Sequence, residues 1–174
     1  ERQRVSELIE RAWAIICAVV SPALLERIGA AEIHVSRSTV RASQRGREIY
    51  IGPNTTLETI LHEYGHHIET HGGLRVPASA LAARTTRAFG MPKAPLRELT
   101  GNRAYGEQEL AYPGGFISPY WSKSYARPIG LGLRATEQIS MAFAYCISVQ
   151  RARELFFADG DLFLRLMDVL GDGG

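Results

Sequence analysis

The sequence predicts an α+β fold: a compact domain whose helices pack on a short, mostly antiparallel sheet. Segments with helical periodicity at both ends, and two short alternating segments between them, indicate this class. The composition, 45% hydrophobic and 22% charged residues, is typical of a globular chain. Because 174 residues suit one domain of roughly 100–200 residues, we expect a single domain over residues 1–174. The first residue is Glu1 rather than methionine, so we interpret the sequence as a piece of a longer protein.

Two helices and two strands are predicted in the first third of the chain. Apolar side chains recur at helical spacing over residues 4–20, and Pro22 begins a short second helix that a serine caps and Gly29 closes. His34 faces away from its apolar neighbours, so we expect it to be exposed and without a role. The segments that alternate apolar and polar side chains, and so predict strands, are residues 31–37 and 47–52.

The linker between the predicted strands is rich in arginine. We interpret it as a solvated loop, and a net charge of only +2 argues against a nucleic-acid partner. A module that binds nucleic acid through this loop is the alternative. Its arginines are Arg37, Arg41, Arg45 and Arg47.

A capping signal marks the start of the next helix. Thr55 and Glu58 stand at capping-box spacing, and the helix is predicted to run to about His71 and to stop at the following glycines. The later segments are predicted as a helix (78–89), an edge strand or hairpin beside a cleft (114–125), and a helical block broken near residues 159–160 (136–170).

The cysteines and the apolar runs restrict the class of protein further. Cys17 and Cys146 lie in apolar helical runs, where we expect small buried side chains; one bridge between them is the alternative. The longest apolar stretch without a charge, residues 12–20, is about half the ~20 residues that a membrane span needs. We therefore predict a core helix there and no membrane span.

Residues 62–66 read His-Glu-Tyr-Gly-His, which is the pattern H-E-x-x-H. On a helix, His62 and His66 lie one above the other, so both imidazoles can bind one tetrahedral zinc ion. Glu63 then lies beside the metal, where its carboxylate can take a proton from the attacking water. We therefore expect Zn²⁺ as the cofactor, with manganese, cobalt and iron ions as alternatives for such ligands.

The helical wheel places these two histidines opposite the apolar face of their helix. His67 lies at the edge of the apolar stripe and His71 inside it, so neither can share the metal while the helix continues. Only a sharp turn of the chain just after His71 would allow it to bind. Gly65 is expected to permit close packing beside the ligands. The apolar stripe consists of Leu57, Ile60, Leu61, Tyr64 and Ile68.

A catalytic zinc normally has three protein ligands, so an acid on another element should complete the site. Glu137 is favoured because it opens a helix with a strip of small residues, beginning at Ser140, that permits close approach of the H-E-x-x-H helix. Glu107 and Glu109 are the principal alternatives. The complete set of candidate acids is Glu98, Glu107, Glu109, Glu137 and Glu154.

Three segments follow one another over about residues 60–150: LHEYGHHIE, GGFISPYWSKSY and ATEQISMAFA. In this order they resemble zincin-fold metallopeptidases, most of all the compact gluzincin-like domains of phage minor head proteins and bacterial polymorphic toxins. The resemblance implies that His62, His66 and Glu137 bind zinc and that Glu63 is the general base. The long interval between His66 and Glu137 departs from the short gap of thermolysin-like enzymes.

The residues and the resemblance together predict a zinc-dependent peptidase that hydrolyses peptide bonds of a protein substrate. Tyr125, or Tyr120, is the candidate donor to the developing oxyanion, and residues 116–120 are expected to bind an extended peptide by adding a strand. The alternative is a zincin-like phage-head or toxin module that keeps its metal for structure or binding and cleaves nothing. We expect a soluble chain, cytoplasmic or exported within a larger effector or phage protein. Nothing in the sequence indicates an oligomeric state.

Overall fold

A computed structural model describes residues 2–72, 92–113, 117–123 and 137–171. The chain divides into two compact units: a larger one, Glu1–Leu74 with Ser140–Gly174, and a smaller one, Arg75–Ile139. The predicted helix at residues 78–89 lies outside the described residues. Helices combine with small sheets in the described part, as the α+β prediction requires.

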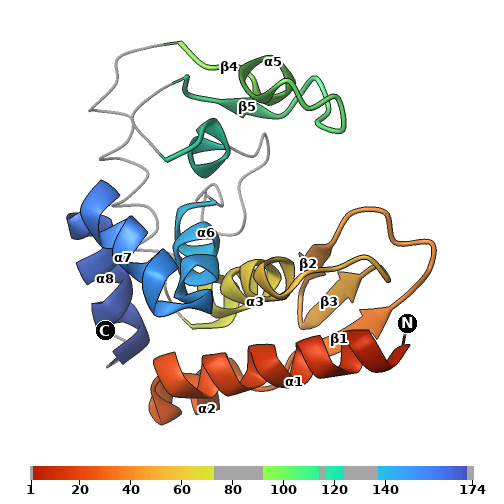
Figure 1. The fold of residues 1–174 in the computed structure, drawn as a ribbon, viewed down its shortest axis with the longest axis vertical. Coiled ribbons are helices and arrows are strands. Elements are labelled where there is room, and N and C mark those ends of the chain that lie inside the picture. Colours follow the sequence, from red (N-terminus) through yellow and green to blue (C-terminus); the bar gives the residue numbers. More distant parts are fainter. Residues whose placement is uncertain (1, 73–91, 114–116, 124–136, 172–174) are drawn as a thin grey trace. The chain divides into compact units, whose positions relative to one another are not determined.

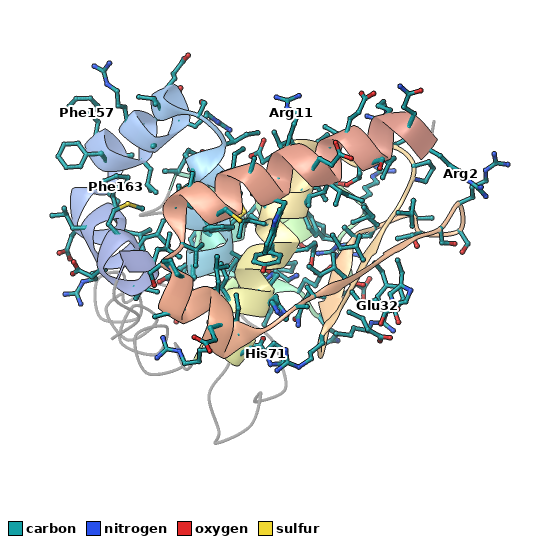
Figure 2. All side chains as sticks on the ribbon, turned by 90° about the horizontal axis from the view of Figure 1, so that it is seen from below. Arg2, Arg11, Glu32, His71, Phe157 and Phe163 are labelled. Atoms are coloured by element: carbon teal, nitrogen blue, oxygen red, sulfur yellow. The ribbon has the colours of Figure 1, made fainter. Side chains whose placement is uncertain are left out.

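The larger unit begins with two helices, as predicted. Helix α1 (Arg2–Val19) packs against α3, and Arg11 points outward from its other side (Figure 2). Helix α2 (Pro22–Ile28) starts where the Ser21 hydroxyl accepts the Leu24 N–H at 3.2 Å, and it ends at a glycine with φ of 67°.

A three-stranded sheet follows, in the order β1-β3-β2 (Figure 1). Strands β1 (Glu32–Val35) and β3 (Glu48–Ile51) are the two predicted ones, and they pair in parallel, with Ile33 opposite Ile49. Strand β2 (Ser43–Arg45) pairs antiparallel with β3. It lies within the linker that we interpreted as a solvated loop, so that interpretation is wrong for these three residues. The predominantly antiparallel expectation therefore holds for β2 but not for the pair of β1 and β3.

Helix α3 (Leu57–His71) lies at the centre of the larger unit, where it packs against α1, α2, β2 and β3. Its cap is Thr56, whose hydroxyl accepts the Thr59 N–H at 3.1 Å, and not Thr55 as the capping-box spacing predicted. Thr55 is instead buried. The whole predicted apolar stripe of this helix is buried, which confirms the face that anchors it: Leu57, Ile60, Leu61, Tyr64 and Ile68.

The predicted C-terminal helical block is interrupted twice. Helix α6 (Gln138–Ala144) runs into the 3₁₀ turn η2 (Tyr145–Ile147), because the next residue, Ser148, is extended and caps a new helix by accepting the Arg151 N–H. Helix α7 (Val149–Ala158) then gives way to α8 (Gly160–Gly171) at the predicted break. Helices α7 and α8 pack together, and Figure 2 shows Phe157 pointing outward from α7.

The smaller unit contains short elements. Strands β4 (Ala94–Pro95) and β5 (Leu110–Ala111) pair antiparallel, and helix α5 (Leu96–Thr100) follows β4 directly. Residues Pro119–Ser122 form a 3₁₀ helix, η1. The edge strand or hairpin predicted over residues 114–125 is therefore wrong for this part.

The turn at η1 has a local cause. Pro119 occupies its first position, the Trp121 N–H donates to the Ser118 carbonyl, and the Lys123 N–H donates to that of Tyr120. Main-chain groups used in a turn are not available to pair with an added peptide strand. The carbonyls of Ser118 and Tyr120 are engaged in this way, and the strand addition expected over residues 116–120 stays a prediction.

Two further expectations concern the cysteines and the apolar run of α1. Both cysteines are free thiols, so there is no bridge between them, and Cys17 is exposed rather than buried. Cys146 is partly buried, and this burial raises the pKa of its thiol to about 11. No helix among the described ones is both long enough and apolar enough to cross a bilayer.

Candidate metal centre

Helix α3 presents His62 and His66 on the side away from its buried stripe. The two residues are one turn apart, and their ring centroids lie 4.7 Å from each other with the planes at 80°. Neither imidazole is fully exposed, and the intervening Glu63 is only 6% exposed. The predicted arrangement of the H-E-x-x-H helix is therefore present in the structure.

Helix α6 approaches α3 closely at Gly65. An ideal Cβ placed on Gly65 would lie 2.6 Å from the Cα of Ser140, a distance that real Cβ atoms do not reach. The absent side chain of Gly65 therefore lets the two backbones touch, in agreement with the strip of small residues predicted on α6. In Figure 1, α6 lies beside α3.

This close contact determines where Glu137 lies. Glu137 comes directly before α6, about one turn ahead of Ser140, and its side chain is completely buried. One ligand atom each from His62, His66 and Glu137 lie within 4.8 Å of one another. Zinc bonds of about 2.0–2.2 Å place tetrahedral ligand atoms about 3.4 Å apart, so small side-chain movements suffice to enclose an ion.

The remaining candidate acids have other environments. Glu98 is exposed, and the carboxylate of Glu107 lies 2.9 Å from the Arg97 guanidinium. Glu154 pairs with Arg151 at 2.8 Å on the surface of α7. Among the described residues, Glu137 alone of these acids joins the two histidines in a group that can hold a metal.

The other two histidines of α3 bond to main-chain carbonyls, as far as the described residues show. His67 is completely buried, and its Nε2 lies 3.2 Å from the carbonyl oxygen of Gly29. Burial lowers the pKa of His67, which favours its neutral form. The Nε2 of His71 lies 2.8 Å from the carbonyl oxygen of Gly46. Both histidines therefore connect α3 to neighbouring turns, in keeping with their exclusion as ligands.

Of the two tyrosines proposed as oxyanion donors, the structure describes Tyr120. Tyr125 lies outside the described residues. Tyr120 belongs to η1; its ring lies 5.7 Å from that of Tyr105, and the Lys123 Nζ is 5.3 Å from its centroid.

Lys123 is a residue that no sequence pattern singled out. Its ammonium group is 2.8 Å from Oε1 of Glu109 and 3.3 Å from Oε1 of Glu137, and its side chain is only 4% exposed. The chain contains 18 arginines but only two lysines. That compositional rarity, and the place of Lys123 within the segment GGFISPYWSKSY, are signals in the sequence that could have drawn attention to it.

A second group of potential ligands lies on one face of β1 and β3. The Nε2 of His34 is 3.5 Å from a carboxylate oxygen of Glu32 and 3.5 Å from one of Glu48, and its ring stacks on Tyr50. His34 is half-buried rather than exposed as expected, because the parallel register places both acids beside it. This group is more exposed than the one on α3.

Compared with protein-family models, with curated proteins and with solved structures, the chain shows no match. The chemistry assigned to it must therefore be argued from its own side chains.

Proposed function

We propose that the protein is a zinc-dependent peptidase of the gluzincin type. The observation that supports this most is the group formed by His62, His66 and Glu137, two imidazoles from one helix and a buried carboxylate ahead of another. Two histidines and a glutamate are the ligand set of one class of catalytic zinc site, which keeps a fourth position open. Glu63, next to the first ligand, supplies the carboxylate that such an enzyme needs as a base.

Each residue of the proposed site has a separate part in the reaction. A zinc ion held there would lower the pKa of a water toward 7 and polarise the scissile carbonyl. Glu63 accepts the proton of the attacking water and delivers it to the leaving amine. Tyr125 or Tyr120 donates to the developing oxyanion in this proposal. The substrate class is a peptide bond within a protein or peptide.

The test compares Glu63→Gln with the wild type for zinc content and for cleavage of a peptide library. We expect the variant to retain about one zinc per chain and to lose at least ~100-fold in kcat, because general-base catalysis contributes about 10²–10⁴-fold. His62→Ala should lose both zinc and activity. Glu58→Gln, the same change in the first turn of α3 and outside the site, should alter neither.

Two results would decide against the proposal. Full cleavage activity in Glu63→Gln with zinc bound would exclude Glu63 as the base. Zinc binding by the wild type with no peptide cleaved anywhere in the library or in a proteome digest would favour a metal that serves structure or binding only.

A further inference from the structure

We propose that Lys123 is a positioning residue that fixes the carboxylate of Glu137 for metal binding, and that Glu109 in turn fixes Lys123. This inference rests on the metal site of the proposed function. It adds a cation and a third carboxylate beside the proposed ligand, in roles that no motif of the sequence indicates.

A continuous set of contacts leads from the main chain to the ligand. The N–H of Gly106 donates to Oε2 of Glu109 at 2.7 Å, and Oε1 of the same carboxylate is 2.8 Å from the Lys123 ammonium. The ammonium then lies 3.3 Å from Oε1 of Glu137. Lys123 is also held through its own N–H, which donates to the Tyr120 carbonyl at 3.0 Å. Lys123 is thus held by the Glu109 carboxylate and by its own main-chain hydrogen bond, in addition to its contact with Glu137.

The burial of Lys123 and Glu137 indicates that their contact orients the proposed ligand rather than stabilises the fold. Lys123 is 4% exposed and Glu137 is 0% exposed, so both charges have been removed from water. The desolvation of a buried ion pair commonly cancels its Coulomb attraction, and apolar replacements of such pairs are often equally stable. A buried ammonium beside a potential ligand does, however, hold a carboxylate in one rotamer, and a fixed orientation of the ligand favours metal binding.

The contact with Lys123 is compatible with metal binding by the same carboxylate. A carboxylate has two oxygens with about four lone-pair directions, so one oxygen can accept from an ammonium while the other binds an ion. Ligating carboxylates are usually hydrogen-bonded in this way, and the loss of such a partner typically costs 10–100-fold in metal affinity. Lys123 would also offset part of the negative charge that Glu109 and Glu137 bring together.

The experiment measures zinc affinity of the full chain by competition with a chromophoric chelator, with no need for catalytic activity. We expect Lys123→Met to bind zinc about 10–100-fold more weakly than the wild type. Glu109→Gln should weaken binding by a smaller factor, because it leaves the ammonium in place but loosens it. Lys123→Arg, which keeps the charge, should recover part of the loss.

A matched control is the surface pair Arg97–Glu107 of the same unit, whose atoms are 2.9 Å apart and whose side chains are 39% and 72% exposed. Arg97→Met removes a cation from a carboxylate just as Lys123→Met does, and it should leave zinc affinity unchanged. The absorption bands of the Co²⁺-substituted protein, which report ligand geometry, should shift in Lys123→Met and not in Arg97→Met.

The outcomes separate this inference from the proposed function. If wild-type protein binds zinc and folded Lys123→Met binds it equally or more tightly, the positioning role of Lys123 is wrong while the peptidase proposal stands. If the wild type binds no zinc, the proposed function itself fails. Should Lys123→Met not fold, as judged by circular dichroism, Glu109→Gln decides: unchanged zinc affinity in that variant contradicts the inference.

Discussion

At the scale of single residues, Gly65 has the most demanding position in the site. Its missing side chain allows the backbone of α6 to contact α3, and that contact brings Glu137 to the two histidines. Glycine is unfavourable inside a helix by about 1 kcal/mol relative to alanine, so its presence here calls for a packing reason. The structure supplies one.

We therefore predict that Gly65→Ala lowers the free energy of unfolding by about 1–3 kcal/mol, because the added methyl group overlaps the Ser140 backbone. Urea unfolding followed by circular dichroism measures this. Gly171→Ala in α8 is the control, since a Cβ there meets nothing within 4 Å and the change should cost less than 0.5 kcal/mol, on the order of a surface substitution. Equal stability of Gly65→Ala and wild type would show that the two helices are less close than described.

At the scale of elements, the cap of α3 determines where the helix that carries His62 and His66 begins. Thr56 caps it, and the hydroxyl of the neighbouring Thr55 is buried with no hydrogen-bond partner among the described residues. The two adjacent threonines therefore have different roles, which their shared chemistry does not reveal. Thr56 is exposed and has an extended backbone, whereas Thr55 is buried.

We predict that Thr56→Ala destabilises the protein by about 1 kcal/mol, the usual cost of losing a cap. Thr55→Val, which keeps the shape of the side chain and removes the unsatisfied hydroxyl, should leave stability unchanged or slightly raise it. Thermal unfolding of both variants gives the comparison. A larger loss in Thr55→Val than in Thr56→Ala would restore Thr55 as the cap.

The elements also show which parts of the fold the sequence could predict. The face of α3 follows from spacing within fifteen residues, so the position of His62 and His66 opposite the apolar stripe was predictable once the H-E-x-x-H pattern had singled them out. Glu137 was predictable because small residues on α6 imply a close neighbour. Strand β2 was not, because its polar sequence SQR has no apolar alternation and its pairing with β3 is a tertiary effect.

Two further differences between prediction and structure concern η1 and Lys123. The aromatic residues around η1 favour strands in isolation, but Pro119 and the bond between the Ser122 hydroxyl and the Tyr112 N–H at 2.8 Å hold a turn. Lys123 was missed because ion pairs with acids 14 residues away on either side leave no periodic trace in a sequence. Contacts of this kind become visible only when distant segments are brought together.

At the scale of the whole molecule, a bound metal should raise stability, because the three ligands come together only in the folded chain. With free zinc at about 100 times the dissociation constant, the gain is about 2.7 kcal/mol, or roughly 5–10 °C in Tm for a chain of this size. We predict that a chelator removes this gain from the wild type and changes nothing in His66→Ala. Calorimetry with and without chelator measures it, and equal shifts in both proteins would place the metal elsewhere.

The larger unit is discontinuous in sequence, since residues 75–139 separate its first part from its last. During synthesis, α3 and its imidazoles would therefore emerge from the ribosome well before Glu137 and before α6, α7 and α8, which complete that unit. The hydrogen bond from the N–H of Ser21 to the carbonyl of Leu170, at 2.7 Å, can form only after residue 170 has been translated. A nascent chain that has not yet reached Glu137 therefore lacks one of the three proposed ligands, so the proposed metal site cannot be complete at that stage.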